Sequence, residues 1–130
     1  MKHHLQVATL IVLLFLGVKS DPNTGITTED CDPNTISKRD PYSYAVIQAL
    51  NEVLSATPYA TGFDYTTSVT SDGSNYDFAA FSHGTCETNL TQVDCATCIR
   101  AAYDDVSALC NGHVAGTIGM VDCSIYFGPV

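Results

Sequence analysis

The chain has 130 residues, of which 14 are acidic and five are basic, so its net charge is −9 at neutral pH. Such a charge repels phosphate backbones and anionic lipid headgroups, which argues against nucleic-acid binding and against charge-driven membrane insertion. Neutral glycans and basic protein surfaces stay open as partners. An acidic net charge whose only effect is to keep the protein soluble is also typical of secreted proteins.

The first 20 residues are predicted to be a secretory signal peptide. A lysine near the start precedes a short apolar run, Leu10 to Leu16, and Ser20 is a small residue at the expected cleavage point. The apolar run is too short to span a bilayer. Residues 21–130 then form the mature protein, which we expect to be one extracellular domain with a net charge of −11, because two of the basic residues fall within the signal.

The N-terminal part of the mature chain is predicted to be a loop followed by a helix. The residues before position 40 are rich in Asp, Asn, Thr and Pro, so we expect at most a short strand near Gly25 to Thr28. Asp40 offers an N-cap and Pro41 a first-turn proline. Apolar residues recur at helical spacing from Tyr42 to Ala56, which predicts an amphipathic helix that Pro58 ends.

The rest of the chain is predicted to form a hairpin, a second helix and two closing strands. Phe63 to Val69 and Tyr76 to Phe81 read as strands on either side of a Ser/Asp/Gly/Asn turn. The second helix runs from an N-cap at Asp94 to Leu109. The closing strands are predicted at Val114 to Met120 and at Val121 to Phe127. Two helices and four or five short strands indicate an α+β domain.

Six cysteines lie in the mature part, and three of them form the pattern C-x8-C-x2-C. They are Cys31, Cys86, Cys95, Cys98, Cys110 and Cys123. An even number of cysteines in a small exported domain predicts three disulfides, although sequence spacing alone leaves about 15 pairings open. A zinc site needs a second pair of ligands that the chain does not offer, and a redox Cys95/Cys98 pair would leave four cysteines unexplained.

Other candidate chemistry is sparse. His83 and His113 are the two histidines of the mature chain, and neither adjoins a nucleophile motif. Asp104 and Asp105 are adjacent on a predicted helix, so their side chains point in different directions and cannot act as a catalytic pair. We therefore predict that the protein is not an enzyme and uses neither a metal nor another cofactor.

Two further features concern the surface. Asn89 begins the N-glycosylation sequon Asn-Leu-Thr, in a polar stretch between two cysteines where a surface loop is expected. The tyrosines and phenylalanines at strand spacing are expected to fill the core, and a sugar-stacking platform is the alternative.

The cysteine pattern, the Phe63-Asp-Tyr-Thr-Thr-Ser68 segment and the closing Val121-Asp-Cys123 resemble the ginkbilobin-homologous domain of plants. The resemblance covers essentially the whole mature chain. It implies a five-stranded antiparallel sheet flanked by two helices, and the disulfides Cys31–Cys110, Cys86–Cys95 and Cys98–Cys123. Single-domain members are secreted antifungal proteins, which implies an apoplastic defence role.

The resemblance also implies a mannose-binding site, but this chain departs from it at each family position. The family uses an Asn, an Arg and a Glu where this chain has Asp32, Thr117 and Gly128. Thr117 lacks the planar donor group of arginine, and Gly128 has no side chain. Two functions stay open: a defence lectin that binds mannose-type glycans of fungal walls, and a sugar-blind module that binds an extracellular protein.

Overall fold

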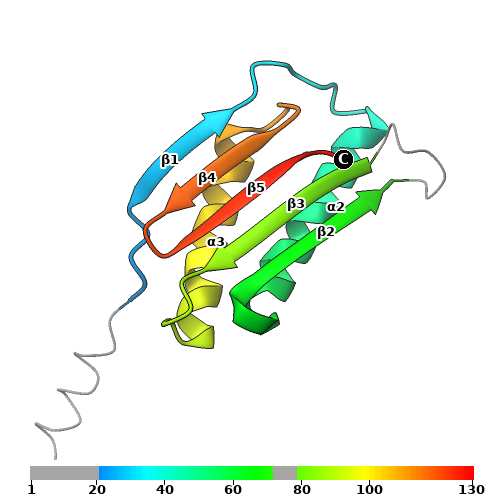
Figure 1. Ribbon diagram of the computed structural model, residues 1–130. Coiled ribbons are helices and arrows are strands. Elements are labelled where there is room, and N and C mark those ends of the chain that lie inside the picture. Colours follow the sequence, from blue (N-terminus) through cyan, green and yellow to red (C-terminus); the bar gives the residue numbers. More distant parts are fainter. Residues whose placement is uncertain (1–20, 72–78) are drawn as a thin grey trace, which may run out of the picture.

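The computed structural model describes residues 21–71 and 79–130 (Figure 1). This part of the chain has the α+β fold that the sequence predicts. Its elements are β1 (Ile26–Cys31), α2 (Pro41–Ala56), the 3-10 turns η1 (Thr57–Tyr59) and η2 (Thr61–Phe63), β2 (Asp64–Thr70), β3 (Ala79–Cys86), α3 (Gln92–Leu109), β4 (Gly116–Met120) and β5 (Cys123–Pro129). The predicted signal peptide, most of the predicted hairpin turn and the start of the predicted strand Tyr76 to Phe81 lie outside the described residues.

The five strands form one antiparallel sheet in the order β1-β4-β5-β3-β2. Both helices pack against the same face of this sheet, α2 over β2 and β3 and α3 over β4 and β5 (Figure 1). No described helix or strand covers the opposite face, which we call the uncovered face. The core lies between the helices and the covered face. Its largest fully buried apolar side chains are Val53, Ile99, Val106, Ile118, Ile125 and Phe127.

The first helix begins and ends as predicted. The Asp40 carboxylate accepts a hydrogen bond from the Tyr42 backbone N–H at 2.9 Å, which satisfies one of the free donors of the first turn. Pro41 occupies the first turn, where its missing N–H does no harm. The α-helix ends at Ala56, two residues before Pro58.

The predicted cap of the second helix was wrong. Thr91, rather than Asp94, is the N-cap of α3, and its hydroxyl accepts a hydrogen bond from the Asp94 backbone N–H at 3.1 Å. Asp94 lies in the first turn, where its negative charge favours the positive end of the helix dipole. A Thr-x-x-Asp pattern before an apolar run is a capping signal, so the sequence contained the information.

The strand boundaries also differ from the predictions. β1 reaches Cys31 instead of ending near Thr28, and the closing strands begin two residues later than predicted. β3 continues to Cys86, five residues beyond the predicted end at Phe81, through a segment that contains Gly84. A Cβ atom at Gly84 would lie 2.5 Å from Val53 Cγ1, so the glycine allows α2 to approach the sheet closely. This tertiary contact explains a strand that local propensity does not predict.

The prediction that the aromatic residues fill the core holds in part. Tyr42 and Phe127 are buried. Tyr44, Tyr59 and Tyr126 are exposed, and Phe81 is half-buried on the uncovered face.

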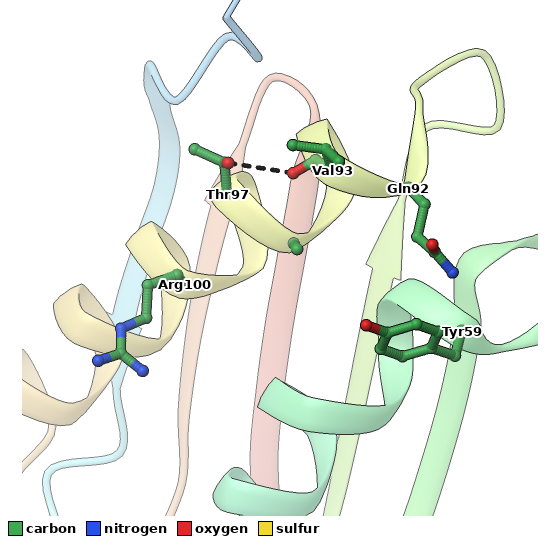
Figure 2. Close-up of a pocket in the computed structure, with 6 residues that line it drawn as sticks. Tyr59, Gln92, Val93, Thr97 and Arg100 are labelled. Carbon is green, nitrogen blue, oxygen red and sulfur yellow. Dashed lines mark hydrogen bonds between the residues drawn. The ribbon is translucent and has the colours of Figure 1, made fainter.

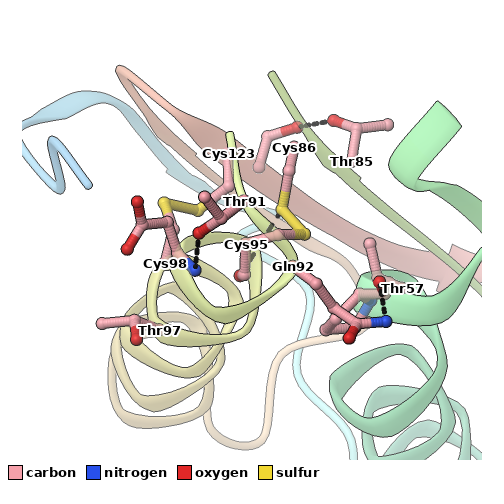
Figure 3. The surroundings of a disulfide bond; sticks show 12 residues. Thr57, Thr85, Cys86, Thr91, Gln92, Cys95, Thr97, Cys98 and Cys123 are labelled. Atoms are coloured by element: carbon pink, nitrogen blue, oxygen red, sulfur yellow. Dashed lines mark hydrogen bonds between the residues drawn. A yellow bond between two sulfur atoms is a disulfide. The ribbon is translucent and has the colours of Figure 1, made fainter. Parts of the chain in front are cut away.

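The structure contains three disulfides, Cys31–Cys110, Cys86–Cys95 and Cys98–Cys123, which are the pairs that the resemblance implies. Cys95 and Cys98 lie on adjacent turns of α3 and bond to different strands, so that α3 is tied to both β3 and β5 (Figure 3). The longest link joins the end of β1 to the end of α3.

Candidate carbohydrate-binding site

Two of the three family sugar positions line one shallow hollow of about 310 Å³ at the edge of the uncovered face. Asp32 directly follows β1, and its backbone N–H donates to the Ala115 carbonyl at 2.9 Å. Thr117 lies in β4. The other lining residues include Asp30 and Tyr126. The hollow therefore combines two carboxylates, a hydroxyl and the ring of a tyrosine.

The third family position, Gly128, lies beneath Tyr126. A Cβ atom at Gly128 would be 2.9 Å from Tyr126 Cζ and would overlap the tyrosine hydroxyl. Residues 126 and 128 are two apart on β5, so both belong to the uncovered face, and the tyrosine leans along the strand over the glycine. The Tyr126 side chain occupies the space that a glutamate at this position would need. Restoring arginine at 117 and glutamate at 128 would consequently not rebuild the family site unless Tyr126 also moved.

The Asp32 carboxylate is held in place by its own turn. Its Oδ1 accepts hydrogen bonds from the Asn34 backbone N–H at 2.8 Å and from Asn34 Nδ2 at 2.9 Å. His113 Nδ1 donates to the Asp32 carbonyl oxygen at 2.6 Å. His113 thus fixes the loop that carries Asp32. The remaining lone pairs of the carboxylate can still accept hydrogen bonds from the hydroxyl groups of a ligand.

A row of directly opposite residues crosses the uncovered face through Tyr126. In order across the five strands it consists of Asp30, Thr117, Tyr126, His83 and Thr66. His83 Nε2 lies 2.6 Å from Asp64 Oδ1, which orients the imidazole ring. In the neighbouring row, Phe81 is opposite Gly128, and the Phe81 and Tyr126 ring centroids are 6.1 Å apart.

The face around Tyr126 therefore combines apolar ring surface with hydrogen-bonding groups. Sequence reasoning missed the placement of Tyr126, Phe81 and the His83–Asp64 pair. Strand alternation was the available signal, because it puts positions 124, 126 and 128 on one face of the sheet.

Tyr42 supports the segment beside the hollow from below. Its hydroxyl donates to the Val114 carbonyl at 2.7 Å. Burial raises the pKa of the Tyr42 phenol well above its usual range, and the nearby Tyr126 phenol adds to this shift. Tyr42 therefore stays protonated and keeps its role as a donor at physiological pH.

A second shallow hollow of about 410 Å³ lies beside the first turns of α3. Figure 2 shows Tyr59 and Arg100 at its two ends, with Val93 and Thr97 between them. The Thr97 hydroxyl donates to the Val93 carbonyl at 3.0 Å, within the helix. The polar groups that line this second hollow do not converge on one point, so it offers a ligand fewer simultaneous contacts than the hollow at Thr117.

Among residues 21–71 and 79–130, no group of three His, Cys, Asp or Glu side chains has the arrangement of a metal site. No helix in these ranges combines the length and apolarity needed to cross a membrane.

A small antiparallel sheet backed by two helices and closed by three disulfides defines a class of compact cysteine-rich domains, and comparison with known proteins identifies the family. Residues 30–128 match the model of the family described as "Salt stress response/antifungal". The chain therefore belongs to this family. The resemblance to ginkbilobin-homologous domains is confirmed.

Two relatives and one solved structure illustrate the similarity. The chain is 25% identical to antifungal protein ginkbilobin-like protein 1 of Picea glauca over 123 residues, covering 95% of this chain and 85% of the relative. It is 26% identical to antifungal protein ginkbilobin-2 of Ginkgo biloba, covering 81% of this chain and 76% of the relative. The tandem DUF26 ectodomain of the Arabidopsis thaliana cysteine-rich receptor-like protein PDLP5 has the same fold, with a TM-score of 0.73 and 20% identity over 82% of this chain. This chain spans half of that tandem ectodomain.

Asn89 is expected to carry an N-linked glycan when the protein passes through a eukaryotic secretory pathway. The residue is exposed in the turn between β3 and α3, so its side chain is accessible for modification. Mass spectrometry of the secreted protein before and after glycosidase treatment measures the change. Asn89→Gln is the control, and an unchanged mass of the wild-type protein after treatment would contradict the expectation.

Proposed function

We propose that this protein is a secreted, apoplastic defence protein of the antifungal type, which binds a neutral glycan through the uncovered face around Tyr126. The names of its relatives support the antifungal class. The observation that carries the glycan proposal is the position of Tyr126, whose side chain fills the space above Gly128 and borders the hollow of Asp32 and Thr117.

The chemistry of this surface suits a sugar. An aromatic ring stacks on the apolar C–H face of a pyranose, while carboxylate and hydroxyl oxygens bind its hydroxyl groups. No lysine or arginine lines the hollow, so a neutral glycan fits better than an anionic one. Simple mannose is expected to bind weakly or not at all, because Thr117 and Gly128 do not provide the charged partners that the family site uses.

Glycan-array binding of the mature protein, followed by calorimetry with the best glycan and with mannose, tests the proposal. Tyr126→Ala is expected to weaken glycan binding about tenfold, since it removes both the stacking ring and a hydroxyl group. Tyr59→Ala removes a tyrosine that is 76% exposed at the other hollow, and should leave binding unchanged. Equal losses in the two variants would place the glycan elsewhere.

The alternative function is a sugar-blind module that binds an extracellular protein. The absence of the family Arg and Glu favours it, because those two groups are replaced by a threonine and a glycine. An array on which no glycan binds, together with retained inhibition of fungal growth, would support this alternative over the lectin.

A further inference from the structure

The outer edge of β2 is free of a partner strand among residues 21–71 and 79–130. β2 is last in the strand order and pairs with β3 alone (Figure 1). The outer edge of such a strand presents unpaired backbone N–H and C=O groups, which can bind another extended chain by strand addition.

The two edges of the sheet differ in how well they are protected. At the opposite edge, β1 carries the charged pair Glu29 and Asp30, and its register shifts between Ile26 and Thr28. β2 stays in regular register over all seven of its pairs with β3. Its one charged residue, Asp64, is at its first position, and the rest are tyrosine, threonine, serine and valine. Charges and bulges are the features that normally block edge pairing, so β2 is the open edge.

The surroundings of this edge are acidic. Glu52 on α2 lies behind the middle of β2, where its Oε1 accepts a hydrogen bond from the Thr67 hydroxyl at 2.9 Å. Asp64 marks one end of the strand. Neither β2 nor α2 contains a lysine or an arginine. An incoming chain therefore meets two carboxylates, of which Asp64 is already bonded to His83 on β3, and no lysine or arginine on β2 or α2.

The same charges oppose a second copy of this protein as the occupant. Antiparallel pairing of two β2 strands about Thr67 would place the two threonines about 5 Å apart and bring both Glu52 carboxylates within about one Debye length. Each copy also has a net charge of −9. Like charges across an interface are unfavourable, so self-pairing is disfavoured.

We propose that the β2 edge binds an extended basic segment of another protein, which adds to the sheet as a sixth strand. A lysine or arginine opposite Thr67 reaches Glu52, and a second one reaches Asp64. Apolar residues opposite Tyr65 and Val69 continue the covered face, since these two side chains alternate with Thr66 and Ser68 along the strand. Asp64 also contacts His83 on the face around Tyr126, whereas Thr67 and Glu52 lie apart from the glycan site.

A designed heptapeptide provides the probe. Thr-Val-Thr-Lys-Thr-Val-Lys, paired antiparallel to residues 70 to 64, places its lysines opposite Thr67 and Asp64 and its valines opposite Val69 and Tyr65. The matched control, Thr-Val-Thr-Glu-Thr-Val-Glu, has similar strand propensity and the opposite charge. Fluorescence anisotropy with labelled peptides is expected to show binding of the basic peptide that is about tenfold tighter, and a loss of this difference at high salt.

Two pairs of protein variants locate the site. Ser68→Lys adds a positive charge to the β2 edge and should abolish binding of the basic peptide, whereas Thr28→Lys adds the same charge to β1 and should leave it unchanged. Glu52→Gln keeps a hydrogen-bond acceptor for Thr67 and should reduce the preference for the basic peptide about threefold. Circular dichroism and thermal unfolding verify that each variant is folded before binding is measured.

Hydrogen exchange then identifies the strand involved. The basic peptide is expected to slow amide exchange in Asp64–Thr70 and to leave Ile26–Cys31 unchanged. Equal affinity for the two peptides, slowed exchange in β1 instead of β2, or a dimer of the free protein that Ser68→Lys dissociates would each overturn the proposal.

Discussion

Replacing Cys31 and Cys110 together by serine is expected to lower the free energy of unfolding by up to about 4.5 kcal/mol. The bond joins residues 79 positions apart, and the chain-entropy model gives the largest effect for the longest loop. Breaking the Cys86–Cys95 bond, with a separation of nine, is expected to cost about 2.7 kcal/mol in the same model. Urea unfolding of the two double-serine variants measures both losses.

The position of β1 gives a second reason for this effect. β1 is an edge strand that pairs with β4 alone, and its side chains before Cys31 are exposed. Little apolar burial therefore holds it in place, and the bond to Cys110 restrains it covalently. Hydrogen exchange in Ile26–Cys31 should accelerate in the Cys31/Cys110 variant and not in the Cys86/Cys95 variant. A larger loss of stability in the Cys86/Cys95 variant would contradict this assignment.

Phe127→Ala is expected to destabilise the protein by about 3 to 5 kcal/mol, because it leaves a cavity beneath the sheet. The side chain is 2% exposed on β5, and a Cβ atom at Gly116 would lie only 2.8 Å from its ring. Neighbouring atoms are thus packed closely around it. A domain of this size has about 5 to 15 kcal/mol of stability in total, so this substitution removes a large part of it.

Tyr126→Ala is the matched control for this prediction. The two aromatic residues are adjacent on β5, but Tyr126 is 38% exposed on the uncovered face. Its loss removes one ring contact with Phe81 and is expected to cost about 1 kcal/mol. Thermal unfolding of both variants compares the two faces of one strand. Equal destabilisation would mean that the uncovered face is packed as tightly as the core.

The fold could be predicted where the sequence carries local signals. Asp40 and Pro41 predict the start of α2. The cysteine pattern indicates the family, and the family implies the five-stranded sheet. The cap at Thr91 could have been found from its spacing to Asp94. The full length of β3 could not, because the segment around Gly84 has low strand propensity and is held by the close approach of α2.

The candidate site was less predictable than the fold. The resemblance implied candidate sugar positions at Asp32, Thr117 and Gly128, which lack the Asn, Arg and Glu of the family. It did not indicate where the Tyr126 side chain would lie, because its conformation depends on the space that Gly128 leaves free. The residue type at a family position predicts whether a contact of the family site is missing. A different contact depends on how neighbouring side chains pack, which sequence spacing does not give.

The overlap between Tyr126 and any side chain at position 128 couples the side chains that these two positions can hold together. A glutamate at 128 and a tyrosine in this conformation at 126 exclude each other, so a side chain at 128 requires Tyr126 to take another rotamer or to be replaced. The glycine at 128 therefore permits this conformation of Tyr126, and the two positions form one steric unit on the uncovered face.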